Sequence, residues 1–285
     1  MKKQNFSQLR LFDYSYVMPQ LPAVLAHSTV TPALQQIART VKTSPLAATI
    51  VLPRETAEKR IQILRERYPS VVADHLTRSA LRKVGLPAVT MVIMPPDKDR
   101  VTVFLLSNIA PDDRENWQQV LDEYEPLTWR NYSLTTQAVM LAESHKYKKP
   151  KTIPVKARER ITWRLSRNAR MTYEKNVKRL IHGRYPRQKT PQNEAKLPAP
   201  GTTRSPTGVR KQLEGLGQHL THYPGLSGIR TDIWLLYMYA ARMWEKQYPK
   251  EAALVWPKPP YSRLLPVKMA PLETLWIDRS TPEEE

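Results

Sequence analysis

The chain has 285 residues, of which 41% are hydrophobic, and its 45 Lys and Arg against 26 Asp and Glu give a formal net charge of +19. Cysteine is absent, which excludes disulfides, cysteine-ligated zinc and a cysteine nucleophile and favours a reducing cytoplasm. The longest apolar run, Ile233 to Ala241, is too short for a membrane span of roughly 20 residues, and prolines and charges interrupt the N-terminal region, so no export signal is predicted.

Runs and spacings of apolar residues predict helices and strands in the first third of the chain. A helix is predicted to begin at Thr31, because an N-cap residue is followed there by proline at the first helical position. The unbroken apolar run at 47–52 is typical of a buried strand. Apolar residues spaced by three and four then predict two amphipathic helices, at 57–68 and 71–84, the second of which ends at Gly85.

A second group of strands follows. Apolar runs at 88–94 and 101–106 predict a hairpin, and 127–134 predicts one more strand. Between them, a helix is predicted to begin at Pro111-Asp112 and to turn four side chains inward: Trp117, Val120, Leu121 and Tyr124. The order from residue 47 is therefore β-α(α)-β-β-α-β, which is the order of the ferredoxin-like arrangement. The predicted fold class is α+β, with an N-terminal βαββαβ core followed by a basic helical segment and an α-helical C-terminal region.

The positive charge is concentrated in the middle of the chain. Residues 126–225 hold 21 Lys and Arg against 5 Asp and Glu, whereas the segments before and after them are close to neutral. Within this third, residues 145–189 carry 16 cations and two carboxylates. Such a density of like charge repels itself unless an anionic partner neutralises it, and polyphosphate backbones are the commonest such partner. The pattern favours nucleic-acid binding over a solvated basic linker.

The C-terminal half is predicted to be helical. Apolar residues every four positions from Ile161 to Ile181 predict a basic amphipathic helix, although the alternation of Ile161, Trp163 and Leu165 also allows a short strand at its start. A helical hairpin is predicted over 208–248, and its second helix is apolar on nearly all faces, which predicts burial or a docking surface. The predicted divisions are an α/β domain at 1–144, a basic arm and helix at 145–189, a proline-rich linker at 190–207, and a helical hairpin with a proline-rich tail at 208–285.

Cations interleaved with aromatic rings are typical of nucleic-acid surfaces, because cations contact phosphates and rings stack on bases. The basic segment has both. We expect its cations to bind phosphates, whereas Trp163 and Tyr173 either stack on bases or, as is more usual for large rings, pack against the core. The predicted nucleic-acid-binding residues are Lys146, Lys148, Lys149, Lys151, Arg158, Arg160, Arg164, Arg167, Arg170, Lys175, Lys178, Arg179, Arg184 and Arg187, with Trp163 and Tyr173.

A glycine-rich stretch, GLGQHLTHYPGLSG at 215–228, is the second feature that suggests chemistry. Glycine lets backbone N–H groups approach phosphates, and His219 or His222 could act as an acid–base group. The leucine spacing through the stretch is nevertheless explained by an ordinary helix. A third metal ligand is missing near the two histidines, and the sequence has no P-loop, dinucleotide-binding or metal-nuclease motif. We therefore predict no metal, no cofactor and no catalytic residue.

Together these patterns predict a soluble, cytoplasmic protein that binds DNA or RNA as an accessory or subunit of a larger nucleoprotein assembly. A protein partner could dock on the apolar helix at 229–248, and no membrane contact is expected. Two alternatives stay open: a metal-independent ribonuclease or other nucleic-acid-processing enzyme that uses His219 or His222, and a structural assembly protein whose basic arm neutralises packaged nucleic acid. Binding without catalysis is favoured, because no catalytic constellation accompanies the histidines.

Overall fold

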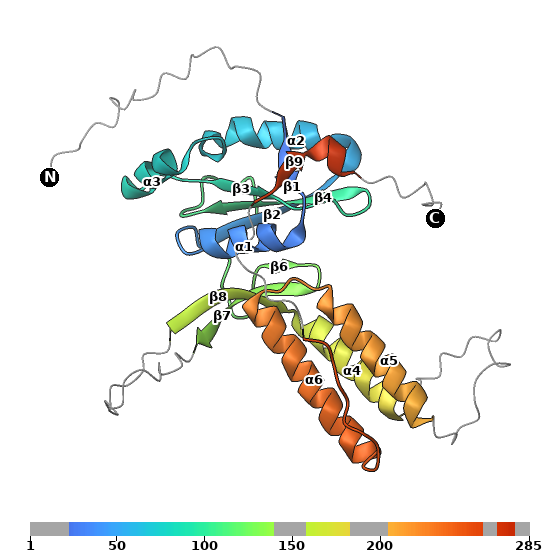
Figure 1. Cartoon of the computed structure of the whole chain (residues 1–285). Coiled ribbons are helices and arrows are strands. Elements are labelled where there is room, and N and C mark those ends of the chain that lie inside the picture. Colours follow the sequence, from blue (N-terminus) through green and yellow to red (C-terminus); the bar gives the residue numbers. More distant parts are fainter. Residues whose placement is uncertain (1–22, 140–157, 183–204, 259–266, 277–285) are drawn as a thin grey trace, which may run out of the picture.

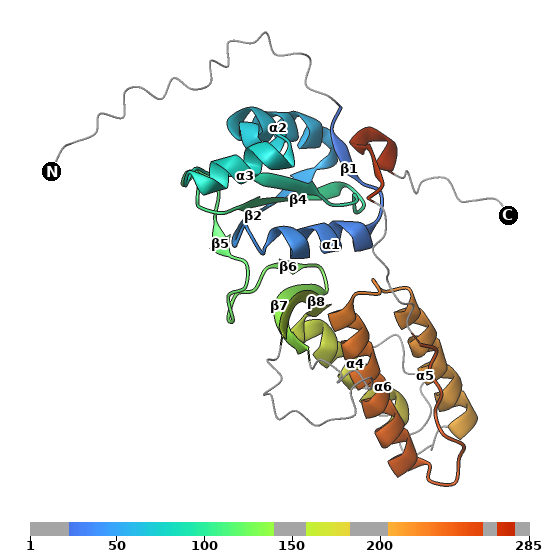
Figure 2. The same cartoon turned by 60° about the vertical axis from the view of Figure 1, so that its left-hand side comes forward.

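The computed structural model describes residues 23–139, 158–182, 205–258 and 267–276, which form a mixed α+β fold with antiparallel sheets (Figure 1). A four-stranded sheet lies between two helices, as the upper part of Figure 1 shows. Below it, a three-stranded sheet carries a layer of three helices that run side by side in Figure 2. The helices above and below the first sheet are α2 (Arg54–Arg67) and α1 (Val30–Thr40), and the lower layer consists of α4 (Arg167–His182), α5 (Pro206–Thr221) and α6 (Ser227–Gln247).

The four-stranded sheet has the order β3-β4-β2-β5, with all neighbours antiparallel: β2 (Leu46–Pro53), β3 (Thr90–Ile93), β4 (Arg100–Ser107) and β5 (Gln118–Gln119). Successive side chains of a strand point to opposite faces, so Phe104 and Leu106 pack in the core that contains α1, whereas Val103 and Leu105 pack in the core that contains α2. Burial of both faces of β4 explains why this strand is a continuous apolar run. The predicted strands at 47–52, 88–94 and 101–106 are confirmed.

Distant parts of the chain meet beside this sheet. Strand β1 (Leu25–His27) pairs antiparallel with β9 (Met269–Pro271), and the short 3-10 helix η4 (Leu272–Leu275) follows. The N–H of Leu272 donates to the carbonyl of Val24 at 2.8 Å, and both side chains are buried in the core on the α2 side. The segment at 267–276 thus completes the first layer of the fold, although some 240 residues separate the paired strands.

Helix α3 (His75–Lys83) follows α2 through the 3-10 turn η2 (Pro69–Val71). The carboxylate of Asp74 caps α3 by accepting the N–H of Thr77 at 2.8 Å, and Gly85 ends it with a left-handed φ of +74°. The sequence predicted this pair of helices and the glycine stop, and the structure confirms them. Helix α1 begins at Val30 after the N-cap Thr29, two residues before the N-cap predicted at Thr31.

The helix predicted from Pro111-Asp112 is wrong. Residues 111–125 form turns and the short strand β5, and Tyr124, which was expected to face inward, is 90% exposed. Other hydrogen bonds take the place of helical ones: Asp112 Oδ1 accepts the N–H of Arg114 at 3.2 Å, the N–H of Val120 donates to the carbonyl of Pro45 at 2.9 Å, and Asp122 Oδ1 accepts the N–H groups of Tyr124 and Glu125 at 2.8 and 2.9 Å. Because this helix is absent, the ferredoxin-like arrangement is not confirmed.

The single strand predicted at 127–134 is instead a hairpin. Strands β6 (Thr128–Trp129) and β7 (Tyr132–Val139) pair antiparallel across a tight turn, in which Arg130 adopts a left-handed φ of +51°. The next strand, β8 (Arg158–Leu165), pairs with β7 and completes the three-stranded sheet in the order β6-β7-β8. The basic helix predicted from residue 161 therefore begins only at Arg167, and the alternative of a strand at its start is confirmed.

The C-terminal helical hairpin is confirmed as α5 and α6. Its second helix is buried on one side only, and Trp234, Leu235 and Met238 on its other side are 56%, 43% and 40% exposed, so the predicted burial holds for one side of the helix. The buried side, which includes Ile233 and Trp244, joins the same continuous core as α1 and one face of the four-stranded sheet. Of the predicted domain boundaries, 144 and 189 fall in segments outside the described residues. Within the described residues, no helix is both long and apolar enough to cross a membrane.

Candidate nucleic-acid interface

Strands β7 and β8 form an antiparallel ribbon over eight residue pairs, from Tyr132↔Leu165 to Val139↔Arg158. The end of the ribbon at 139 and 158 leads to residues 140–157, which carry much of the predicted basic arm. Several predicted phosphate contacts therefore lie outside the described residues: Lys146, Lys148, Lys149, Lys151, Arg184, Arg187 and the side chain of Arg158. The candidate interface within the described residues consists of the remaining cations of β8 and α4.

The inner face of the ribbon belongs to the core. Trp163 is fully buried, and its indole Nε1 donates to the carbonyl of Leu34 in α1 at 2.8 Å. Leu165 is buried beside it, and Ile161 packs against the same core. Trp163 is therefore a core residue whose ring faces no solvent, as the packing alternative predicted, and stacking of a base on it is excluded in this structure.

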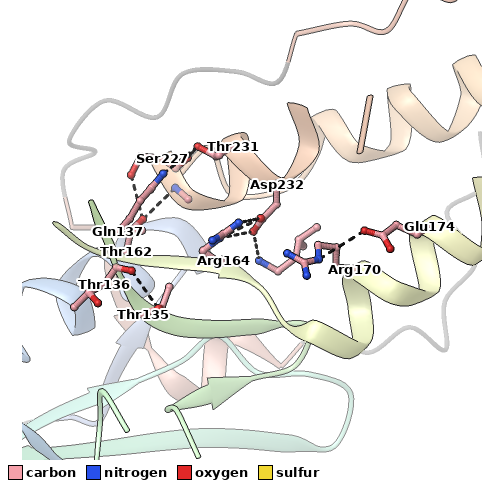
Figure 3. A network of polar contacts seen from close by, with 12 residues as sticks. Thr135, Thr136, Gln137, Thr162, Arg164, Arg170, Glu174, Ser227, Thr231 and Asp232 are labelled. Carbon is pink, nitrogen blue, oxygen red and sulfur yellow. Dashed lines mark hydrogen bonds and ion pairs between the residues drawn. The ribbon is translucent and has the colours of Figure 1, made fainter. Parts of the chain in front are cut away.

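The outer face of the ribbon is polar, and the beginning of α6 lies on it (Figure 3). The hydroxyl of Thr162 contacts that of Ser227 at 3.1 Å and accepts the N–H of Gly228 at 3.2 Å. On β7, the amide of Gln137 donates to the hydroxyl of Thr231 at 3.4 Å. Arg160 stands opposite Gln137 in the pairing of the two strands and is exposed. The outer face thus passes from contacts with α6 to a solvent-exposed cation.

Arg164 forms an ion pair with Asp232 inside the fold. Its guanidinium Nε donates to both carboxylate oxygens of Asp232 in α6, at 3.1 and 3.2 Å, and Nη2 adds a further hydrogen bond. The side chain of Asp232 is 1% exposed, and that of Arg164 is 30% exposed. A charge that neutralises a buried carboxylate is a poor phosphate ligand, because its release would leave Asp232 buried without a counter-ion. The predicted phosphate contact at Arg164 therefore has a structural role.

The cations of helix α4 differ in their exposure to solvent. Arg167, Lys175 and Lys178 are exposed, and none of the ion pairs among the described residues includes them. Arg170 and Arg179 are half-buried. Arg170 Nε lies 3.7 Å from Glu174 Oε1, one helical turn away on the same helix. The opposite side of α4 buries Ala169, Val177 and Ile181, so packing fixes which side of the helix faces solvent.

Tyr173 packs inside an aromatic cluster. Its hydroxyl is hydrogen-bonded to that of Tyr223, and Tyr223 in turn contacts Tyr132 edge-on, with ring centroids 5.9 Å apart. Burial, with a smaller contribution from the bond to Tyr223, raises the pKa of Tyr173 well above its ordinary value. Burial likewise raises the pKa of Tyr132. Both phenols therefore stay protonated and act as packing and hydrogen-bonding groups, and Tyr173 follows the packing alternative of the sequence analysis.

The two histidines of the glycine-rich stretch lie at the end of α5. His219 is exposed, and its ring contacts Tyr223 at a centroid distance of 5.6 Å, while His222 is the exposed C-cap of the helix. Among the described residues, no group of three His, Cys, Asp or Glu side chains could hold a metal ion. The stretch is a helix and turn, in which Gly217 makes room for the ring of Trp256.

Sequence reasoning missed Arg130. It stands in the left-handed position of the β6–β7 turn, where its guanidinium lies 4.5 Å from the ring centre of Trp129 and its Nη2 lies 2.8 Å from Asp97 Oδ2. These groups, with Lys98, line an open cleft of about 420 Å³ next to the four-stranded sheet. No sequence signal marks the cleft, because its walls come from turns that are some 30 residues apart. No protein-family model matches the chain, and no curated protein or solved structure shows significant similarity to it.

Proposed function

We propose that this protein binds nucleic acid through a basic surface formed by the exposed end of the β7–β8 ribbon and the exposed side of α4. The observation that carries the proposal is the set of three exposed cations on α4, Arg167, Lys175 and Lys178, that take part in none of the ion pairs of the described residues. Ala169, Val177 and Ile181 on the opposite side of α4 are buried, so packing of the helix holds the cations on a fixed surface.

The spacing of these cations suits a phosphate backbone. Arg167 and Lys178 are 11 residues apart in one helix, which corresponds to about 16 Å along its axis at roughly 1.5 Å per residue. One strand of duplex DNA carries a phosphate about every 3.4 Å of axis, so a parallel helix of this length would pass about five phosphates. Arg160, near the start of β8 and seven residues before α4, would add a further contact.

Contacts of this kind set affinity and orientation, not sequence choice. The two rings that could have stacked on bases are in the interior or half-buried in the tyrosine cluster, which supports binding to the backbone over recognition of bases. An accessory role in a nucleoprotein assembly is supported by α6, where Trp234, Leu235 and Met238 form an exposed apolar group. Exposed aromatic and apolar groups of this kind are typical of protein docking surfaces.

The proposal is tested by reversing two charges. The double variant Lys175→Glu/Lys178→Glu is compared with the matched control Lys42→Glu/Lys59→Glu. Lys42 and Lys59 are also exposed but lie on other parts of the fold, and both double variants change the net charge by the same amount. Binding to labelled single- and double-stranded DNA and RNA is measured across a salt series. We expect the α4 variant to bind at least about tenfold more weakly and with a flatter log–log salt slope, and the control to stay near the wild type.

Two outcomes would contradict this interface. Equal weakening by both double variants would mean that net charge alone, and no particular surface, attracts the polyanion. Undiminished binding by the α4 variant would place the contact elsewhere. The ranking of the four nucleic acids identifies the preferred partner, because the phosphate geometry differs between single strands, B-form DNA and A-form RNA.

A further inference from the structure

The outer edge of strand β2 is open along most of its length. β2 pairs with β4 over all eight residues from Leu46 to Pro53, but on its other side β5 pairs only with Leu46 and Ala47. In the part of the chain that the structure describes, no strand is assigned beside residues 48–52. Thr49 is exposed, and Val51 is 54% exposed. An open edge presents unpaired backbone N–H and C=O groups, and proteins usually cover or blunt such edges because other chains pair with them.

A cleft lies on each side of this edge. The first, of about 420 Å³, lies over one face of the sheet, where Thr49 and Val51 of β2 and Arg100 and Thr102 of β4 line it together with Lys98 and Arg130 from two turns. The second, of about 380 Å³, is lined by Ile50 and Leu52 from the opposite face. Ile63 and Leu64 in α2 also line it, together with Arg60, Arg67 and Glu115. Val51 borders both clefts, so the edge runs between them.

This arrangement matches the geometry of an added strand. Successive side chains of an extended peptide point to opposite faces, so a strand paired with β2 would place alternate side chains in the two clefts. Residues 48–52 offer an edge of five residues, or about 17 Å at roughly 3.3 Å per residue. Main-chain hydrogen bonds would then provide affinity, and the two clefts would select side chains.

The walls of the clefts define the chemistry of the occupant. In the first cleft, Arg130 is paired with Asp97 at 2.8 Å, and Arg100 lies 3.9 Å from Asp99. Lys98, held at a left-handed φ of +56°, takes part in none of the ion pairs of the described residues, so this cleft favours an acidic side chain. In the second cleft, Arg67 is paired with Glu115 at 2.6 Å and Arg60 is exposed, while four aliphatic side chains, Ile50, Leu52, Ile63 and Leu64, line the rest, so this cleft favours a branched aliphatic side chain. A second copy of the chain is disfavoured as the occupant, because each copy carries a net charge of +19.

We propose that the open edge of β2 binds an extended segment of a partner protein in which acidic and aliphatic residues alternate. The surface is separate from the exposed side of α4, so the proposal does not depend on nucleic-acid binding. It adds a peptide-binding site at the edge of the four-stranded sheet.

The probe is a pool of labelled, blocked seven-residue peptides with Glu at every second position and Val, Ile or Leu at the others. Their binding to the full chain is followed by fluorescence anisotropy at about 150 mM salt, where long-range attraction to a basic protein is screened. We expect saturable binding that weakens at least tenfold in the Val51→Glu variant, which puts a like charge on the edge. The matched control is Val255→Glu, since Val255 is 65% exposed outside the sheet and should leave binding unchanged.

Two further measurements identify the binding mode. The peptides are methylated at every second backbone nitrogen, in one pool at the Glu residues and in a second pool at the aliphatic residues. Only one of the two pools should bind at least tenfold more weakly, because only one edge of the added strand pairs with β2. Lys98→Glu should weaken binding of the Glu peptides and favour a pool with Lys in place of Glu. Absence of saturable binding, equal binding by the Val51→Glu variant, or equal tolerance of both methylated pools would each overturn the proposal. A wild-type dimer that Val51→Glu converts to a monomer would also overturn it, in favour of pairing between two copies.

Discussion

The carboxylate of Asp232 joins α6 to β8 by binding both the guanidinium of Arg164 and the backbone N–H of Leu165, the latter at 2.9 Å. Asp232 is almost fully buried, and these contacts attach the helical layer to the edge strand of the three-stranded sheet (Figure 3). Asp232→Ala would leave the Arg164 charge without its partner and the Leu165 N–H unsatisfied. We expect a loss of about 3 kcal/mol in the free energy of unfolding, measured by urea denaturation.

The matched control for this prediction is Glu174→Ala, which breaks the more exposed ion pair with Arg170 in α4. An exposed pair of this kind contributes little, so the loss should be below about 0.5 kcal/mol. Similar losses in both variants would contradict the structural role assigned to Asp232. Arg164→Ala should likewise lower stability without flattening the salt dependence of nucleic-acid binding, which would separate it from the exposed cations of α4.

Gly228 allows α6 to lie directly on β8. A Cβ atom at this position would stand 2.5 Å from the carbonyl oxygen of Trp163 and 2.8 Å from side-chain carbons of Thr162 and Arg164. The carbonyl belongs to the backbone of a paired strand and cannot move aside without disturbing the sheet. Gly228→Ala should therefore destabilise the protein by about 2 kcal/mol through overpacking. The measurement is the midpoint of chemical or thermal unfolding.

Gly215→Ala is the control for Gly228→Ala. Gly215 lies in α5, where an added Cβ atom would have no tertiary neighbour within 4 Å, so alanine should raise stability by up to about 1 kcal/mol through its better helix propensity. The two substitutions add the same methyl group to the same residue type and are expected to have opposite signs. The same sign in both would mean that the close approach of α6 to β8 is not what requires glycine at 228.

Apolar periodicity was sufficient to predict the elements whose burial is set by their own sequence. The strands buried on both faces and the helices α1, α2, α5 and α6 follow from runs and spacings of apolar residues. Between Pro111 and Glu125 the same spacing was misleading, because the side chains of Asp112 and Asp122 bind nearby backbone N–H groups and Val120 pairs with Pro45, so turns and a short strand take the place of a helix. Such local competition depends on side-chain geometry that a pattern of apolar residues does not contain.

The candidate site was predictable in its charge and not in its arrangement. The excess of cations is visible in the sequence, but the side of α4 that faces solvent depends on packing against α5 and α6. In the sequence, Arg164 could not be distinguished from the other cations of the basic segment. Its structural role follows from its contact with Asp232, which is 68 residues away in the chain. Arg130 and the open edge of β2 depend on long-range pairing of strands, which no local pattern encodes.

Trp163→Phe separates a core role from a role in binding. The substitution removes the indole N–H that donates to Leu34, and it reduces the buried volume. We expect a loss of about 2 kcal/mol in the free energy of unfolding, with nucleic-acid affinity unchanged for the folded variant. Trp234→Phe, at an exposed position of α6, should have almost no effect on stability. If the Trp163 variant folded normally but lost affinity for nucleic acid, the assignment of this ring to the core would be wrong.

His27 should make stability depend on pH as the pH falls through the ordinary histidine pKa of 6.5. The side chain is fully buried in β1, and its Nε2 donates to Oε1 of Gln36 at 2.8 Å. Burial lowers the pKa of His27 below its ordinary value of 6.5, and the bond to Gln36 offsets part of this effect. The native state therefore takes up the proton at a lower pH than the unfolded chain does, and stability falls as the pH drops through 6.5.

The measurement is the free energy of unfolding in urea at pH 7.5, 6.5 and 5.5, for the wild type and for His27→Leu. The wild type should lose stability toward pH 5.5, with a slope of at most about 1.4 kcal/mol per pH unit, and the variant should show a flatter profile. The lowered pKa values of Asp74 and Asp122 contribute only at lower pH, because these carboxylates stay ionised until the pH falls to their ordinary value of 3.8 or below. Equal slopes for the wild type and His27→Leu would show that another group controls the acid limit of the fold.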